Sequence, residues 1–212
     1  MLTRNRLFLM LLGCLLLPKV IFGQIGELNH GMFDHGNTYT AINNSYDSPV
    51  GLAVYPASST TNAGKFLLAG DGNVSGHTQY VSTLVRFNSD GTLDTTFNST
   101  GKATVDFTGG TTNFCKDVII LSDEKILVLT EHRISGGSEL ALAKFNDNGT
   151  LDTSFGTSGI YHAQVGGQSI YPRSMAEQKN GAIVVCGSTG TYNSCVVRVA
   201  AKDTFVPSAP NL

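Results

Sequence analysis

The feature that most constrains the fold of this chain is a phrase of fifteen residues that occurs twice. It reads "FNSDGTLDTTFNSTG" at Phe87–Gly101 and "FNDNGTLDTSFGTSG" at Phe145–Gly159, an offset of 58 residues with nine identical positions. Repetition over such a distance, in a chain of 212 residues, is typical of arrays, solenoids and propellers. The phrase therefore indicates repeated supersecondary units.

Each copy of the phrase is followed by the same order of short apolar segments separated by polar or glycine-containing turns. After the first copy these are "KATVDF", "CKDVIIL", "KILVLTE" and "ELALAKF", and after the second "IYHAQV", "PRSMAEQ", "AIVVCGS" and "SCVVRVA". Short runs rich in β-branched residues and bounded by turns are read as strands. The repeats thus predict tandem four-stranded antiparallel units and an all-β fold.

A third, more divergent copy lies upstream. "GELNHGMFDHG" at Gly26–Gly36 aligns with the phrase, and "GLAVYP", "GKFLLAG" and "STLVRF" align with the strands. We therefore expect residues 24–205 to form three β repeats, at about 26–90, 91–148 and 149–205, followed by a C-terminal tail at 206–212.

The strand "KILVLTE" predicts how the units pack. Ile126 and Val128 point to one face and Leu127 and Leu129 to the other, so both faces are apolar. A sheet with one face in water would alternate between apolar and polar residues. Four-stranded sheets stacked face to face, as in a β-propeller, explain the pattern. Closed propellers have at least four blades, so about three units predict an open or incomplete array.

Residues Arg86–Gly101 and Lys144–Gly159, each close to a "KILV"-like strand, resemble the delta-60 repeat, a bacterial β-propeller-type repeat. The first unit departs from the pattern at Asn29, His30 and Met32, and the third lacks the Asp-Gly turn after Val199. The resemblance implies an exported or cell-surface protein. It does not specify a function, because propellers host many activities.

The repeat signature within the phrase has two interpretations. One is a calcium loop, since the oxygen ligands Asn88, Asp90 and Asp94 surround a glycine turn and recur as Asn146, Asn148 and Asp152. A calcium loop of the EF-hand type, however, requires more acids and a distal Glu. We therefore favour the second interpretation, a structural joint, and expect no metal here. Its residues are Asp90, Gly91, Leu93, Asp94, Phe97, Asn148, Gly149, Leu151, Asp152 and Phe155.

In the joint interpretation each residue type has a mechanical role. Asp-Gly and Asn-Gly make tight turns with positive φ, and Asp94 and Asp152 accept backbone hydrogen bonds from the residues that follow. We expect the phrase to step from one sheet into the next and its Phe side chains to plug the seam between them.

Other candidate sites are weaker. The histidines are scattered, and His30, Asp34 and His35 form a short cluster where a zinc site would still need three or four converging ligands. The sequence has no G-x-S-x-G, H-E-x-x-H or phosphate-loop motif, so we expect neither an enzyme nor a cofactor. Cys186 and Cys195 lie on consecutive predicted strands. They form either a disulfide or two free cysteines that pack as small hydrophobes.

The N-terminus predicts export. Basic residues precede an apolar run from Leu7 to Leu17 that is too short to span a bilayer, so residues 1–23 are read as a signal peptide. Lipidation at Cys14 is a less favoured alternative, because the apolar run continues past it. Removing the peptide leaves 11 basic and 16 acidic residues, a net charge of −5, which disfavours nucleic acid and anionic membranes as partners.

Together these features predict a non-enzymatic scaffold for binding or surface display of an unknown protein or carbohydrate, located in the periplasm, at the cell surface or outside the cell. Rigid scaffolds carry recognition on loops, here predicted at Ala57–Gly64, Asp71–Tyr80, Ile134–Glu139 and Ser188–Ser194. Open sheet edges favour self-association. The alternatives are blades of a larger propeller enzyme or carbohydrate-binding module, or a truncated remnant without independent function.

Overall fold

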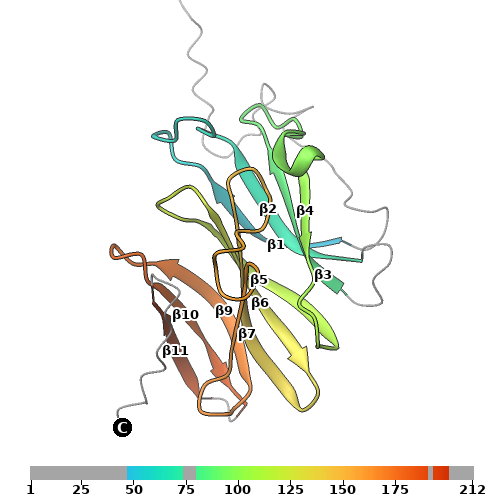
Figure 1. The fold of residues 1–212 in the computed structure, drawn as a ribbon, viewed down its shortest axis with the longest axis vertical. Coiled ribbons are helices and arrows are strands. Elements are labelled where there is room, and N and C mark those ends of the chain that lie inside the picture. Colours follow the sequence, from blue (N-terminus) through green and yellow to red (C-terminus); the bar gives the residue numbers. More distant parts are fainter. Residues whose placement is uncertain (1–46, 74–79, 191–192, 201–212) are drawn as a thin grey trace, which may run out of the picture.

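The computed structural model describes residues 47–73, 80–190 and 193–200. These residues form eleven β-strands and one short 3-10 turn, η1, at Phe97–Ser99 (Figure 1). The strands are β1 Asp47–Val54, β2 Phe66–Asn73, β3 Tyr80–Phe87, β4 Lys102–Val105, β5 Thr112–Ile120, β6 Ile126–Ile134, β7 Gly137–Phe145, β8 Ile160–Ala163, β9 Ile170–Glu177, β10 Ile183–Thr189 and β11 Ser194–Val199.

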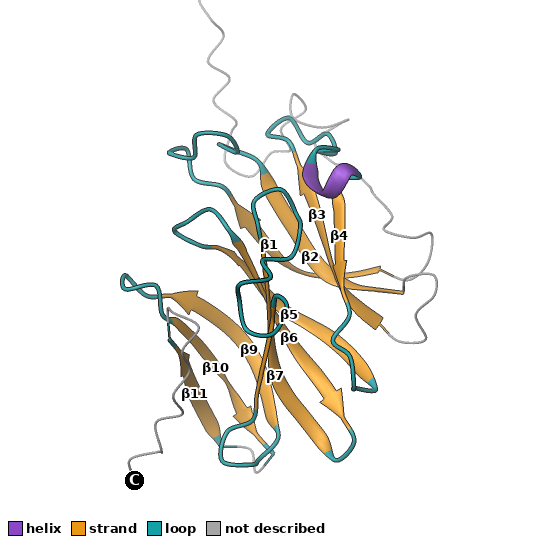
Figure 2. Ribbon diagram, in the orientation of Figure 1, coloured by secondary structure: helices purple, strands orange, loops and turns teal. Residues whose placement is uncertain are grey.

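The strands make three antiparallel sheets in chain order. The first sheet is β1-β2-β3-β4, the second is β5-β6-β7-β8, and the third is β11-β10-β9. Within each sheet, strands that follow one another in sequence pair, so each sheet is a simple meander, and strands dominate the molecule (Figure 2). The predicted all-β fold of repeated antiparallel sheets is confirmed, with four strands in two sheets and three in the described part of the last.

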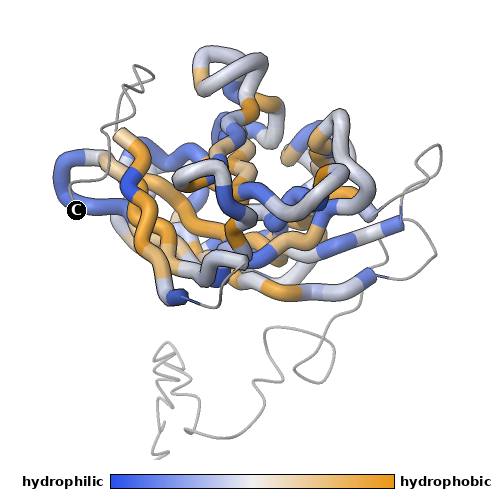
Figure 3. Tube along the Cα trace, turned by 90° about the horizontal axis from the view of Figure 1, so that it is seen from below, coloured by the Kyte–Doolittle hydropathy of each residue, from blue (hydrophilic) through white to orange (hydrophobic). Residues whose placement is uncertain are grey.

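The second sheet is buried on both faces by its two neighbours. Ile126 and Val128 belong to the apolar core shared with the first sheet, whereas Leu127 and Leu129 belong to the core shared with the third. The assignment of these four side chains to opposite buried faces is therefore confirmed. Hydrophobic residues recur along the stacked strands (Figure 3), as expected where sheets pack face to face.

The two ends of the stack leave apolar side chains in solvent. On β1, Val50, Leu52 and Val54 are exposed on the face that points away from the second sheet. On β11, Val196 is 71% exposed on the face that points away from the core. Exposed apolar residues on the outer face of each terminal sheet are consistent with an array that is open at both ends.

The phrase connects two strands of one sheet rather than two sheets. β4 follows the first copy and pairs with β3, and β8 follows the second copy and pairs with β7. The prediction that the phrase steps into the next sheet was therefore wrong. The physical reason is a pair of isolated bridges, Phe87↔Leu93 and Phe145↔Leu151, which fold the phrase back against the strand it leaves. Sequence units drawn at 91–148 and 149–205 are thus out of phase with the sheets by one strand.

The segment Ile134–Glu139 is not the variable loop that the sequence predicted. β6 runs to Ile134 and β7 begins at Gly137, and these two residues are paired in register. Gly136 has φ 96°, a conformation that allows a two-residue hairpin. The strands extend further than expected because this tight turn keeps the ladder intact to its tip.

Several predictions concern residues outside the described ranges: the signal peptide, Cys14, the first copy of the phrase with His30, Asp34 and His35, and the C-terminal tail. Within the described ranges, none of the helical structure is long and apolar enough to cross a membrane.

Candidate functional site

The first half of each phrase is a tight turn closed by a side-chain acceptor. Asp90 Oδ1 accepts hydrogen bonds from the backbone N–H and the hydroxyl of Thr92, at 2.9 and 2.7 Å. Asn148 Oδ1 accepts the same two bonds from Thr150, at 3.0 and 2.7 Å. Gly91 and Gly149, with φ of 85° and 88°, occupy positions that other residues adopt only with strain. Asp and Asn are interchangeable here because only one acceptor oxygen is used.

In the second half of the phrase, the two carboxylate oxygens of Asp94 have different partners. Asp94 Oδ1 accepts from the backbone N–H and the hydroxyl of Thr96, at 3.1 and 2.6 Å. Its other oxygen, Oδ2, lies 2.8 Å from Lys65 Nζ and 2.7 Å from Arg86 Nε. One oxygen therefore shapes the turn and the other pairs with two cations.

Asp152 repeats this arrangement with fewer partners. Its Oδ1 accepts from the backbone N–H and the hydroxyl of Ser154, at 3.2 and 2.6 Å, and its Oδ2 lies 2.7 Å from Lys125 Nζ. Lys65 and Lys125 were missed as partners from sequence. The signal was present, because each is a lysine at the start of the second strand of its unit.

The aspartates are held as carboxylates by these contacts. Burial raises the pKa of Asp94, but Lys65, Thr96 and Arg86 together hold it well below its usual range. For Asp152, burial also raises the pKa, and Lys125 and Ser154 bring it below the usual value. In Asp94 and Asp152, protein cations occupy one carboxylate oxygen and the turn residue Thr96 or Ser154 occupies the other, so the geometry favours the joint over the calcium loop.

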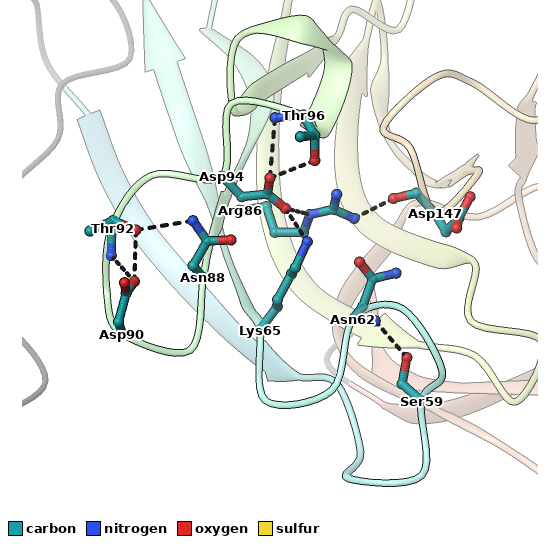
Figure 4. A network of polar contacts seen from close by, with 10 residues as sticks. All are labelled: Ser59, Asn62, Lys65, Arg86, Asn88, Asp90, Thr92, Asp94, Thr96 and Asp147. Carbon is teal, nitrogen blue, oxygen red and sulfur yellow. Dashed lines mark hydrogen bonds and ion pairs between the residues drawn. The ribbon is translucent and has the colours of Figure 1, made fainter.

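Arg86 links the first phrase to the second. Its guanidinium binds Asp94 through Nε, and its Nη1 donates to the backbone carbonyl of Asp147 in the second phrase. The same group lies over the rings of Phe97 and Tyr55, at 4.7 and 5.9 Å from their centroids. Figure 4 shows the side chain of Arg86 between Asp94 and Asp147, with Lys65 reaching Asp94. This contact joins the first two units.

The aromatic residue of the phrase covers the seam without entering the next sheet. Phe97 is fully buried, and its ring lies so close to Gly149 that an added Cβ would stand 2.8 Å from it. The backbone N–H of Asn98 donates to the carbonyl of Asn148 at 2.7 Å. Phe155 is half-buried and packs against the core between the second and third sheets.

Leu93 and Leu151 sit beneath the end of each phrase. A Cβ added at Gly101 would meet the side chain of Leu93 at 2.6 Å, and one added at Gly159 would meet that of Leu151 at 3.1 Å. Both glycines have positive φ. The final glycine of the phrase therefore allows the chain to pass over the leucine and enter the fourth strand.

The second joint contains a polar groove. Lys144 takes the place of Arg86, and its Nζ lies 3.4 Å from Asp123 Oδ2. A hollow of about 260 Å³ remains, lined by acidic and basic side chains and by the ring of Phe155; the charged residues are Asp123, Lys125, Lys144, Asp152 and Glu177. This recess combines side chains of both charge signs with an aromatic residue, features that suit a small polar ligand.

Cys186 and Cys195 are free, and the sheet register explains why. Cys186 pairs with Val196, and Cys195 pairs with Gly187. Since directly opposed residues share a face and successive residues alternate, the two cysteines point to opposite faces. Cys186 is exposed, whereas Cys195 packs against the inner core. The disulfide interpretation was wrong, because Cys195 lies one residue away from the position directly opposite Cys186.

Comparisons with known proteins agree with this architecture. Residues 64–97 and 121–155 match the family model described as "Domain of unknown function (DUF5122) beta-propeller". Two blades of this chain are thus similar to β-propeller repeats. Each matched segment contains the lysine and ends at the aromatic residue of the phrase, so it includes the Lys65–Asp94 or the Lys125–Asp152 ion pair.

Curated proteins gave no match to this chain. Among solved structures, one described as a protein of unknown function from Bacteroides caccae is similar at 14% identity, with a TM-score of 0.33. The match covers 73% of this chain and 61% of that one, so this chain spans less than two thirds of the length of that protein.

Proposed function

We propose that this chain is an exported, non-enzymatic β-propeller-like scaffold of the delta-60 type, which stacks with further sheets of the same kind through its open ends. The observation that carries the proposal is the pair of apolar outer faces, on β1 and on β11. Each lies where the repeat would place another sheet.

The register of the sheets supports this proposal at the first end. Leu52 pairs with Leu68 as Val118 pairs with Val128, so Leu52 and Val118 hold equivalent positions in their sheets. Val118 is buried by the first sheet, whereas Leu52 is 63% exposed. An exposed leucine at a position that is a core position in the next repeat indicates a face shaped for a neighbouring sheet.

The other end shows the complementary face. Val196 pairs with Cys186 as Leu142 pairs with Leu129, and Leu142 is buried against the third sheet. The two open faces are therefore the two different halves of the same repeated interface. Contact between unlike faces is head-to-tail and produces rings or longer arrays.

Stacking predicts an assembly that a single charge disrupts. We expect the purified protein to have a mass above that of the monomer by size-exclusion chromatography with light scattering, and Leu52→Glu and Val196→Glu to shift it to the monomer. Val165→Glu, at an exposed apolar position away from both faces, is the matched control and is expected to assemble as the wild type does. A wild-type monomer, or equal behaviour of all three variants, would rule out stacking between copies.

Export predicts a defined N-terminus. The chain expressed in a bacterial host with its own export machinery is expected to appear outside the inner membrane beginning at Gln24, as read by mass spectrometry of the intact protein. Leu11→Arg places a charge in the apolar run and is expected to abolish cleavage. Cys14→Ser is expected to leave cleavage unchanged, whereas loss of processing with that variant would favour the lipoprotein alternative.

Ligand recognition is proposed at the polar groove of the second joint. Carbohydrates suit such a recess, because they present hydroxyl groups to charged side chains and a ring face to an aromatic wall. The ion pairs at both joints bind turn residues of the fold itself, which supports a scaffold more than a catalytic role.

A further inference from the structure

Three side chains that could bind a metal converge on the face of the second sheet that points toward the first. His132 lies on β6, Glu139 on β7 and His162 on β8. His132 and Glu139 are directly paired across the hairpin, and His162 pairs with Ala141, which shares a face with Glu139. Neighbouring positions on one face of adjacent strands bring side chains within reach of each other.

The spacing of their ligand atoms is close to that of a metal site. Glu139 Oε1 lies 2.8 Å from His162 Nδ1 and 3.9 Å from His132 Nε2. One ligand atom from each residue can be chosen so that all lie within 4.8 Å of one another. Tetrahedral zinc, with bonds of about 2.0–2.2 Å, separates its ligand atoms by about 3.3–3.5 Å. Small side-chain rotations would therefore complete the site.

A hydrogen-bond chain fixes the protonation of His132. Asn113 Nδ2 donates to the carbonyl of Tyr80 at 3.0 Å and to Asp106 Oδ1 at 3.1 Å. This leaves Asn113 Oδ1 as the acceptor that faces His132 Nδ1 at 2.7 Å. His132 Nδ1 therefore carries the proton, and in the neutral ring Nε2 presents a lone pair toward Glu139. Metal-binding histidines are oriented by such a bond from the nitrogen that does not bind the metal.

An aromatic ring packs against the two histidines, and one of them is partly open to solvent. Phe107 packs against both imidazoles, with centroid distances of 5.9 Å to His132 and 5.7 Å to His162. A Cβ added at Gly110 would stand 2.7 Å from His132 Nε2, so only glycine fits where the loop passes this ring. His132 is buried, but the side chain of His162 is 34% exposed, which gives an ion a path from solvent.

We propose that His132 Nε2, the Glu139 carboxylate and the His162 imidazole bind one divalent transition-metal ion, zinc by preference. Two imidazoles and a carboxylate are a ligand set that zinc accepts, with water in the fourth position. The His162 nitrogen that binds the ion must carry no hydrogen, so metal and proton compete for it. The ion would tie the outer strand β8 to β6 and β7.

The test is titration of the purified, chelator-treated protein with zinc chloride by calorimetry, and with cobalt(II) by visible absorption. The background variant carries Cys186→Ser and Cys195→Ser, which removes the two free thiols that are not buried as competing ligands, whereas Cys115 is buried. We expect one equivalent to bind with a tetrahedral cobalt spectrum, and the melting temperature to rise with zinc. His162→Ala and Glu139→Gln are each expected to weaken binding by more than about 100-fold.

Matched controls locate the site. Glu177→Gln, an acidic residue on another sheet, and the double change His30→Ala with His35→Ala are expected to leave zinc binding unchanged. Circular dichroism checks that His162→Ala and Glu139→Gln remain folded, and His162 tolerates change because it is partly exposed. The absence of saturable binding would overturn the proposal. Binding that survives both ligand variants, or that is lost with the His30 and His35 changes, would overturn it as well.

Discussion

Phe97→Ala is expected to lower the free energy of unfolding by about 3–5 kcal/mol, the usual effect of removing a fully buried phenylalanine. Phe97 is completely enclosed, in contact with the second phrase at Gly149 and beneath the Arg86 guanidinium. Its loss leaves a cavity at the first joint and removes the surface on which Arg86 rests. Urea denaturation followed by circular dichroism measures the change.

Phe155→Ala is the matched control, because it removes the same side chain from the second copy of the phrase. Phe155 is only half-buried, so we expect roughly half the effect of Phe97→Ala, since stabilisation scales with the apolar area removed from water. Equal effects of the two changes would contradict the view that the first joint is the tighter one.

Asp94→Asn is expected to destabilise the protein by about 3–5 kcal/mol, because it leaves the buried Arg86 without its counter-charge. The side chains of Arg86 and Asp94 are 4% and 3% exposed. Asparagine keeps an oxygen that can accept the bonds from Thr96, as Asn148 accepts the corresponding bonds from Thr150 at the Asp90 position of the second phrase, so the substitution isolates the charge. Urea denaturation again gives the measurement.

The control for this change is Asp152→Asn. The partner of Asp152 is Lys125, whose side chain is 32% exposed, and pairs of this kind contribute about 0–1 kcal/mol. A loss at Asp152 as large as that at Asp94 would show that the turn geometry, rather than the buried ion pair, is responsible.

The ion pair between Asp94 and Arg86 also makes the free energy of unfolding depend on pH. The pKa of Asp94 is lower in the folded protein than in the unfolded chain, so the unfolded state takes up its proton first as pH falls. The contribution of Asp94 is therefore fully present above about pH 4 and is lost progressively below it. Stability measured by urea between pH 7 and pH 3 is expected to fall more steeply for the wild type than for Asp94→Asn.

The fold was predictable because its signals are local and repeated. In β6, the apolar residues Ile126, Val128, Leu127 and Leu129 occupy both faces, which indicates a strand buried on both sides. The repeat shows a similar pattern more than once. The connection of the sheets was harder to predict. The phrase reads the same whether it crosses to a new sheet or folds back, and only the bridge between Phe87 and Leu93 decides between them.

The candidate metal site could not be read from the sequence for a related reason. His132, Glu139 and His162 belong to three strands, and their approach depends on hairpin register. Treating Ile134–Glu139 as a loop removed the pairing that sets His132 opposite Glu139. A two-residue turn at Ser135–Gly136 would have supplied the register, and with it two of the three ligands.

The position of the fourth strand has a consequence for how arrays of this kind grow. β4 and β8 come after the phrase but pair with the strand before it. If a repeat is taken to begin at the Asp-Gly or Asn-Gly turn, its first strand therefore belongs to the sheet of the preceding repeat. Duplication of such a segment would interlock each sheet with the next stretch of chain. In the described residues the third sheet has no strand in the place of β4 and β8, and in this scheme the last sheet of an array keeps an edge that the next phrase would cover. Growth by this route carries an unfinished edge forward with every added unit.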